Sequence, residues 1–131
     1  MKKAFILIIS LFISGNALFA QTTDEEQIKK VIMDSYINGI HNRTMVEEIS
    51  RGFHPCFVLL GIGADKSTVT LLPIYNWLET VKARREKDGP AANKMECDFK
   101  SIDITGTAAV AKIVLSVQGK NIYTDYLGLY K

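Results

Sequence analysis

Met95 to Lys131 reads MECDFKSIDITGTAAVAKIVLSVQGKNIYTDYLGLYK, and its apolar and polar residues alternate over three successive runs. Alternation with a period of two is typical of strands that bury one face. Turn residues separate the runs at Thr105-Gly106-Thr107 and at Gly119-Lys120. The segment therefore predicts a three-stranded antiparallel meander. The alternation slips by one residue near Lys100–Ser101, which predicts a β-bulge at that point.

The residues before this meander predict helices that cover its apolar face. Thr23 and Glu26 form a capping box, which is typical of a helix N-terminus. In chain order, the expected elements are helices over 24–41 and 45–51, strands over 57–61 and 68–72, and a helix from Pro73 to Lys87. The predicted fold class is α+β, in the order α-α-β-β-α-β-β-β, with a bent antiparallel sheet packed on three helices.

The N-terminal residues have the composition of a signal peptide. Lys2 and Lys3 precede an apolar run that ends at Ile13, and a cleavage site follows at Ala20. We expect residues 1–20 to be a cleaved signal peptide, residues 21–131 to be one domain, and the protein to be periplasmic or secreted. The alternative is a single membrane anchor, but the apolar run is short for a membrane span, so no stable anchor is expected.

The charge of the chain limits the classes of partner that it can bind, and its two cysteines raise the question of a disulfide. The chain of 131 residues has 16 basic and 14 acidic side chains, and loss of the signal peptide removes two of the lysines. A mature domain of near-neutral charge is not expected to bind nucleic acid. Cys56 and Cys97 could form a disulfide in an oxidising compartment, or remain free thiols on apolar strand faces.

Four local motifs, in this order, resemble the nuclear transport factor 2-like superfamily and, within it, the bacterial putative lumazine-binding group. They are Phe53-His54-Pro55, the residues 71–77 (LLPIYNW), 102–111 (IDITGTAAVA) and 123–129 (YTDYLGL). The resemblance spans nearly the whole mature chain. It implies a cone-shaped domain in which a strongly bent sheet wraps around the helices and encloses a pocket.

The same resemblance leads to expectations about the chain's end and its partners. The family pattern continues into a sixth strand, so we expect the chain to be a C-terminally truncated fragment that lacks this final strand. The group's name implies a pteridine-like ligand, and members of the superfamily often pair through the sheet. A small apolar or aromatic ligand and a homodimer are therefore the expected partners.

No catalytic motif stands out in the sequence. There is no Ser/His/Asp order with supporting motifs, no metal-ligand spacing and no phosphate-binding loop, so no catalytic residue, metal or cofactor is predicted. Tyr36, Trp77 and Tyr126 are the residues expected to bind a ligand in the cone. Asp103 and Asp125 are further candidates to line it, although Asp103 precedes a turn and is more simply explained as capping that turn.

Two functions remain open at this level. The first, which we favour, is a secreted binding or accessory domain whose pocket needs only shape and an apolar lining. The alternative is a cofactor-independent lyase or isomerase, in which His54, Asp125 and Tyr36 act as acid and base. This enzyme would need a titratable group that faces the pocket within hydrogen-bond reach of another. His41, at the end of a predicted helix, is interpreted as structural.

Overall fold

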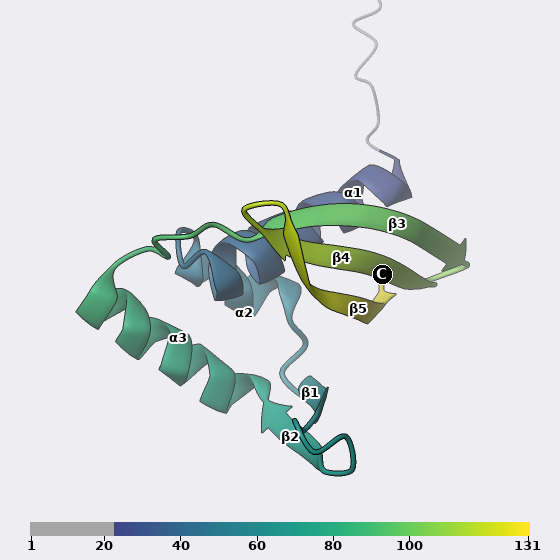
Figure 1. The fold of residues 1–131 in the computed structure, drawn as a ribbon. Coiled ribbons are helices and arrows are strands. Elements are labelled where there is room, and N and C mark those ends of the chain that lie inside the picture. Colours follow the sequence, from purple (N-terminus) through teal and green to yellow (C-terminus); the bar gives the residue numbers. More distant parts are fainter. Residues whose placement is uncertain (1–22) are drawn as a thin grey trace, which may run out of the picture.

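The computed structural model describes residues 23–131, so the predicted signal peptide lies outside the described residues (Figure 1). Its helical elements are α1 (Asp24–Val31), the π-helix η1 (Ile32–His41), the short 3-10 helix η2 (Val46–Glu48), α2 (Ile49–Gly52) and α3 (Ile74–Asp88). Its strands are β1 (Val58–Ile62), β2 (Val69–Pro73), β3 (Glu96–Thr105), β4 (Ala108–Val117) and β5 (Lys120–Tyr130). The α+β class and the predicted order of elements are confirmed.

Strands β3, β4 and β5 form the predicted antiparallel meander, with β4 in the middle. The register of β3 against β4 shifts between Phe99 and Ser101, which confirms the predicted bulge. The second turn has positive φ angles at Gln118 and Gly119, as a tight hairpin turn requires. Strands β1 and β2 pair only with each other, so within the described residues the sheet is in two parts rather than continuous.

The first helix covers the inner face of the meander. Its N-terminus has the predicted capping box, in which the Glu26 amide donates to Thr23 Oγ1 and the Thr23 amide donates to the Glu26 carboxylate. The helix then widens from α1 into η1, and the Asn42 amide donates to the Ile37 carbonyl over five residues. The sequence predicts one helix over 24–41 and does not predict that its second part is a π-helix.

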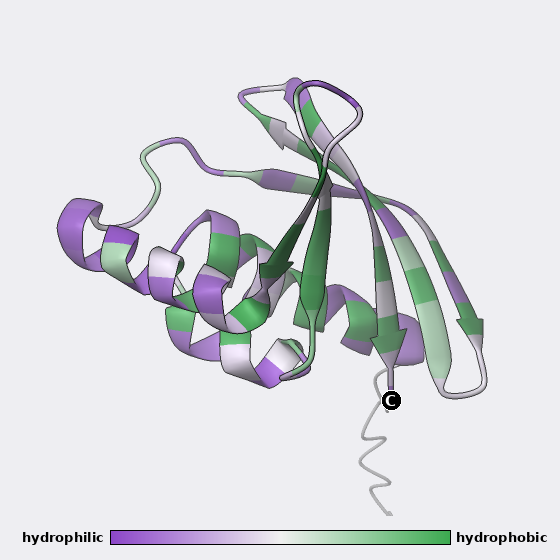
Figure 2. Cartoon of the chain, turned by 90° about the horizontal axis from the view of Figure 1, so that it is seen from below, coloured by the Kyte–Doolittle hydropathy of each residue, from purple (hydrophilic) through white to green (hydrophobic). Residues whose placement is uncertain are grey.

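The hydrophobic core lies between η1 and the central strand. The largest side chains with less than 2 % exposure are Ile37, Ile49, Ile113 and Leu115. Figure 2 shows that hydrophobic residues recur along both the helices and the strands of the meander. The buried and exposed residues of β4 alternate as the sequence predicts. The core that they form with the first helix holds the helix and the meander together.

A buried asparagine joins the end of the first helix to the start of the meander. Asn42 is 5 % exposed, and its amide nitrogen donates to the Met95 carbonyl at 3.2 Å. The Met95 amide donates back to Asn42 Oδ1 at 2.7 Å. The Asn42 side chain therefore gives one hydrogen bond to the backbone of Met95 and receives one from it, as a paired strand would. These two bonds fix the position of the chain just before β3.

Replacement of Asn42 by aspartate should lower the free energy of unfolding by roughly 1–3 kcal/mol. The carboxylate cannot donate to the Met95 carbonyl, which would lose this partner, and a charge would be buried. Urea unfolding of the mature chain measures the effect. The same change at the exposed Asn76 is the control and should leave the stability nearly unchanged. Equal midpoints for the two variants would contradict this role of Asn42.

Candidate functional site

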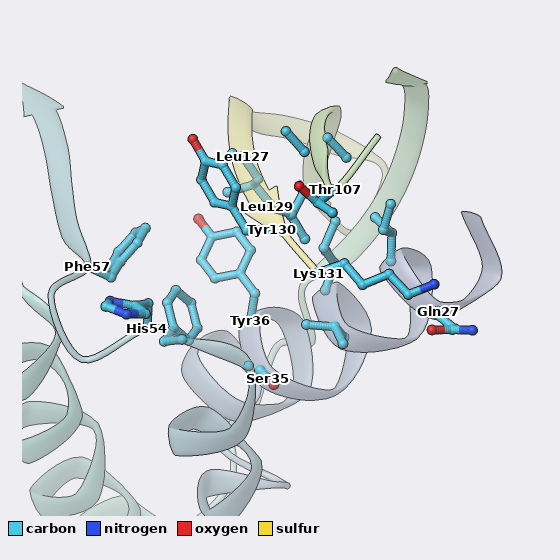
Figure 3. A pocket seen from close by; sticks show the side chains of 18 of the residues that line it. Gln27, Ser35, Tyr36, His54, Phe57, Thr107, Leu127, Leu129, Tyr130 and Lys131 are labelled. Carbon is cyan, nitrogen blue, oxygen red and sulfur yellow. The ribbon is translucent and has the colours of Figure 1, made fainter. Parts of the chain in front are cut away.

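An open pocket of about 590 Å³ lies between the first helix, the loop that follows α2, and the far ends of the β3–β4 hairpin and β5 (Figure 3). Its volume is in the range of small-molecule sites. The outer end is lined by charged residues, and there Lys131 Nζ contacts Asp24 Oδ1 at 2.6 Å. The inner end is lined by Tyr36, Phe53 and Phe57, with Leu127 and Leu129 facing them from β5.

Two polar side chains among the lining residues are deeply buried, those of Ser35 and Tyr36. The Ser35 hydroxyl donates to the Glu48 carbonyl at 2.8 Å. Tyr36 is 6 % exposed, and its hydroxyl donates to Asp125 Oδ2 at 2.7 Å. Burial, reinforced by the hydrogen bond to Asp125, raises the pKa of Tyr36 far above its usual value. The phenol therefore stays protonated at neutral pH, and it donates this proton in a hydrogen bond to the half-buried carboxylate of Asp125.

Aromatic rings surround Tyr36 and fix its orientation. Its ring meets those of His41, Phe53 and Trp77 edge to face, with centroid distances of 4.7, 6.1 and 6.0 Å. Edge-to-face contacts of this kind stabilise aromatic clusters beyond the area that they bury. The aromatic cluster therefore fixes the ring of Tyr36, and Asp125 fixes its hydroxyl.

His41 belongs to this cluster and is half-buried, and its buried Nε2 atom has no hydrogen-bond partner within the described part of the chain. Burial lowers the pKa of His41, although the nearby Asp125 carboxylate acts in the opposite direction. The neutral imidazole is therefore favoured in the folded protein. This fits the structural interpretation of His41, which fills the space between Tyr36 and Trp77.

His54 lies on the rim of the pocket rather than at its inner end. The side chain is exposed, and Nδ1 accepts a hydrogen bond from the Cys56 amide at 3.1 Å. This bond shapes the turn that leads from α2 into β1. No hydrogen bond among residues 23–131 joins His54 to Tyr36 or to Asp125, so the structure brings together only two members of the predicted acid–base set.

The other residues predicted to line the pocket lie elsewhere, so this part of the prediction is wrong. Tyr126 points to the outer face of the meander and is 67 % exposed, because alternation along β5 sets it opposite to Asp125 and Leu127. Its ring lies 5.5 Å from Lys112 Nζ. Trp77 packs behind Tyr36 in the core and does not line the pocket. Asp103 is exposed on β3.

Several residues that line the pocket are not among those predicted from the sequence. Phe53 and Phe57 form one wall, and their rings meet edge to face at 4.8 Å. Leu127 and Leu129 form the facing wall, and they belong to the same face of the third run as Asp125. The alternation that predicts strand β5 could have identified these leucines, whereas the pairing of the phenylalanines depends on the loop conformation.

Other groups in the described residues add no reactive centre to the pocket. Cys56 and Cys97 are free thiols, and Cys56 lies in an exposed turn rather than on a strand face. Burial raises the pKa of Cys97 to about 11, so that thiol is protonated. Residues 23–131 contain no group of three or more His, Cys, Asp or Glu side chains arranged for a metal ion. In the same range, no helix combines the length and apolar character of a membrane span.

Comparisons with known proteins agree with this architecture. The family described as "Putative lumazine-binding" matches residues 23–131. A crystal structure of an "NTF2-like protein of unknown function" from Shewanella baltica OS155 superposes with a TM-score of 0.58 at 20% sequence identity. The similarity covers 85% of this chain and 86% of that chain, and at this identity it shows the fold alone. The search of curated proteins gave no match.

The half-buried His41 predicts how stability changes with pH. Because the folded pKa of His41 is below its unfolded value of about 6.5, the unfolded state binds more protons in acid. The free energy of unfolding should therefore fall as the pH drops below about 6.5, by at most about 1.4 kcal/mol per pH unit from this residue. Urea unfolding at pH 7.5 and pH 5.5 measures the loss.

His41→Phe is the diagnostic variant, because it keeps an aromatic ring against Tyr36 and removes the unpartnered nitrogen. It should lose less stability on acidification than the wild type. His54→Gln is the control and should behave as the wild type does, since His54 is exposed. An unchanged acid sensitivity in His41→Phe would contradict this assignment.

Proposed function

Because this chain belongs to the putative lumazine-binding family, we propose that it is a binding domain for a small apolar or aromatic molecule held in the open pocket. The observation that carries the proposal is the inner end, where the apolar side chains of Phe53, Phe57, Leu127 and Leu129 lie around the buried hydroxyl of Tyr36. Ligand sites typically combine such an apolar lining with a few fixed polar groups. The family's description favours a planar bicyclic ligand such as lumazine.

The alternative, a cofactor-independent lyase or isomerase, is supported by one observation, the contact between Tyr36 and Asp125. Two titratable groups within hydrogen-bond reach are what such an enzyme needs. The chemistry of the pair favours binding, because the raised pKa of Tyr36 makes the phenol a poor proton donor at neutral pH. Turnover of a bound ligand that is lost in Asp125→Asn, with binding retained, would support the enzyme instead.

The compartment is also a proposal. The basic and apolar composition of residues 1–20 supports a cleaved signal peptide and a periplasmic or secreted mature domain. The mass of the processed chain, expressed with its native N-terminus, checks whether cleavage follows Ala20. A chain that keeps residues 1–20 in the membrane fraction would contradict the proposal.

We further propose that two copies associate through the sheet. The β1–β2 hairpin exposes one apolar face, on which cross-strand pairs such as Leu60 with Leu71 and Ile62 with Val69 are 58 % to 70 % exposed. The face has no charged residue among these positions, so it suits the same face of a second copy, as in an isologous dimer.

Light scattering of the mature chain across a range of concentrations tests this association. The wild type should reach twice the monomer mass, and Leu60→Glu should weaken dimerisation at least about tenfold, since a carboxylate would be buried without a partner. Thr70→Glu, on the opposite face of the same hairpin, is the control. A wild type that stays monomeric at high concentration would exclude the dimer.

Ligand binding itself is tested by thermal unfolding of residues 21–131 with lumazine, flavins, steroids and indoles. A ligand that binds only the folded state stabilises it by about 2.7 kcal/mol at a hundredfold excess over its Kd. Phe57→Ala removes one wall and should abolish the shift, measured against its own ligand-free midpoint. Phe99→Ala removes a ring of the same size outside the pocket and should keep it. If none of the compounds shifts the wild type, the proposed function fails.

A further inference from the structure

We infer that the Tyr36 hydroxyl oxygen, oriented by Asp125, selects heteroaromatic ligands that carry a ring N–H over the same ligands with that nitrogen methylated. This inference rests on the proposed binding function and deepens it, since it names the chemical group of the ligand that the pocket recognises. The selecting atom lies at the inner end of the pocket, where Tyr36 stands between the Phe57 wall and β5 (Figure 3).

The hydrogen-bonding capacity of Tyr36 leaves only an acceptor for a ligand. A phenol has one O–H to donate and lone pairs on oxygen to accept with. The one proton is directed to Asp125 at 2.7 Å. An incoming ligand therefore meets oxygen lone pairs, and it can satisfy them only with a donor of its own.

The state of the pair is maintained by its surroundings. Asp125 is half-buried, and no salt bridge in the described part of the chain involves it, so Tyr36 is its hydrogen-bonded partner there. The phenol keeps its proton because burial and the carboxylate both raise its pKa. A donor placed on the Tyr36 oxygen would polarise the O–H toward Asp125, and chains of hydrogen bonds strengthen one another in this way.

The apolar walls of the pocket cannot provide the same discrimination, and the other buried hydroxyl of the lining, Ser35, already donates to the Glu48 carbonyl at 2.8 Å. Phe53, Phe57, Leu127 and Leu129 offer flat apolar surface, which binds an N–H and an N-methyl ring about equally well. Charged side chains such as Asp24 and Lys131 lie at the outer end and contact each other. A methylated nitrogen at the inner end would leave the buried acceptor unpaired, and sites built around a hydrogen bond strongly reject analogues that lack the partner.

Two matched pairs of probes test the inference, namely lumazine with 1,3-dimethyllumazine and indole with 1-methylindole. Calorimetric titration of the mature chain gives a Kd for each probe. The wild type should bind the N–H member of a pair at least about tenfold more tightly than the methylated member. In Tyr36→Phe this ratio should fall to near one.

Two further variants separate recognition from a structural role. Tyr126→Phe makes the same chemical change on the outer face and should keep the wild-type ratio. Asp125→Leu frees the Tyr36 proton, so the hydroxyl can donate as well as accept, and the ratio for the lumazine pair, whose methylated member has carbonyl acceptors, should fall below the wild-type value. Asp125→Leu also serves as the second test if Tyr36→Phe fails to fold.

The outcomes separate this inference from the proposed function. If both members of a pair bind the wild type equally, the selectivity is refuted while the binding function stands. If Tyr36→Phe weakens both members by the same factor and keeps their ratio, the tyrosine is only structural and the inference is refuted. If no probe binds, the proposed function fails and the inference fails with it.

Discussion

Burial of the first helix against strand β4 is the constraint on which the rest of the structure depends. Ile37 from η1 and Ile113 and Leu115 from β4 are fully buried, so this contact excludes water along the centre of the domain. Burial of each such side chain contributes roughly 1.5–3 kcal/mol. The pocket exists because this close packing ends before the outer part of the helix, where α1, the loop after α2 and the end of β5 diverge around open space.

A polar pair inside such a core is costly unless it is satisfied, and Tyr36 and Asp125 satisfy each other. A hydrogen bond to a charged group contributes about 1.5–3 kcal/mol. The bond also joins the helix to the last strand of the meander, residues that are far apart in the sequence. His41 is different, because its Nε2 has no partner among the described residues, and burial therefore favours the neutral ring.

Local patterns in the sequence predicted the parts of the fold that depend on local chemistry. The capping box at Thr23, the bulge after Phe99 and the inward residues of β4 follow from spacing alone. The site was predicted less well. Tyr36 was selected, but Tyr126 and Trp77 were misplaced, because aromatic character does not say which face of an element meets the pocket. Alternation along β5 already separates Tyr126 from Asp125, whereas the π-helical turns and the Phe53–Phe57 contact depend on tertiary packing.

The Tyr36–Asp125 bond links stability and recognition in one interaction. The Tyr36 hydroxyl donates its one proton to Asp125, and this bond joins the helix to β5. The same proton is therefore not offered to a ligand, and the Tyr36 oxygen can only accept a hydrogen bond from one. Any change to either residue must then alter both folding and affinity. The affinity of a variant for one ligand reflects both effects. The stability of that variant is the same for both members of a matched ligand pair, so it cancels when their affinities are compared. The ratio of affinities within a pair therefore isolates recognition, which makes this physical coupling open to experiment.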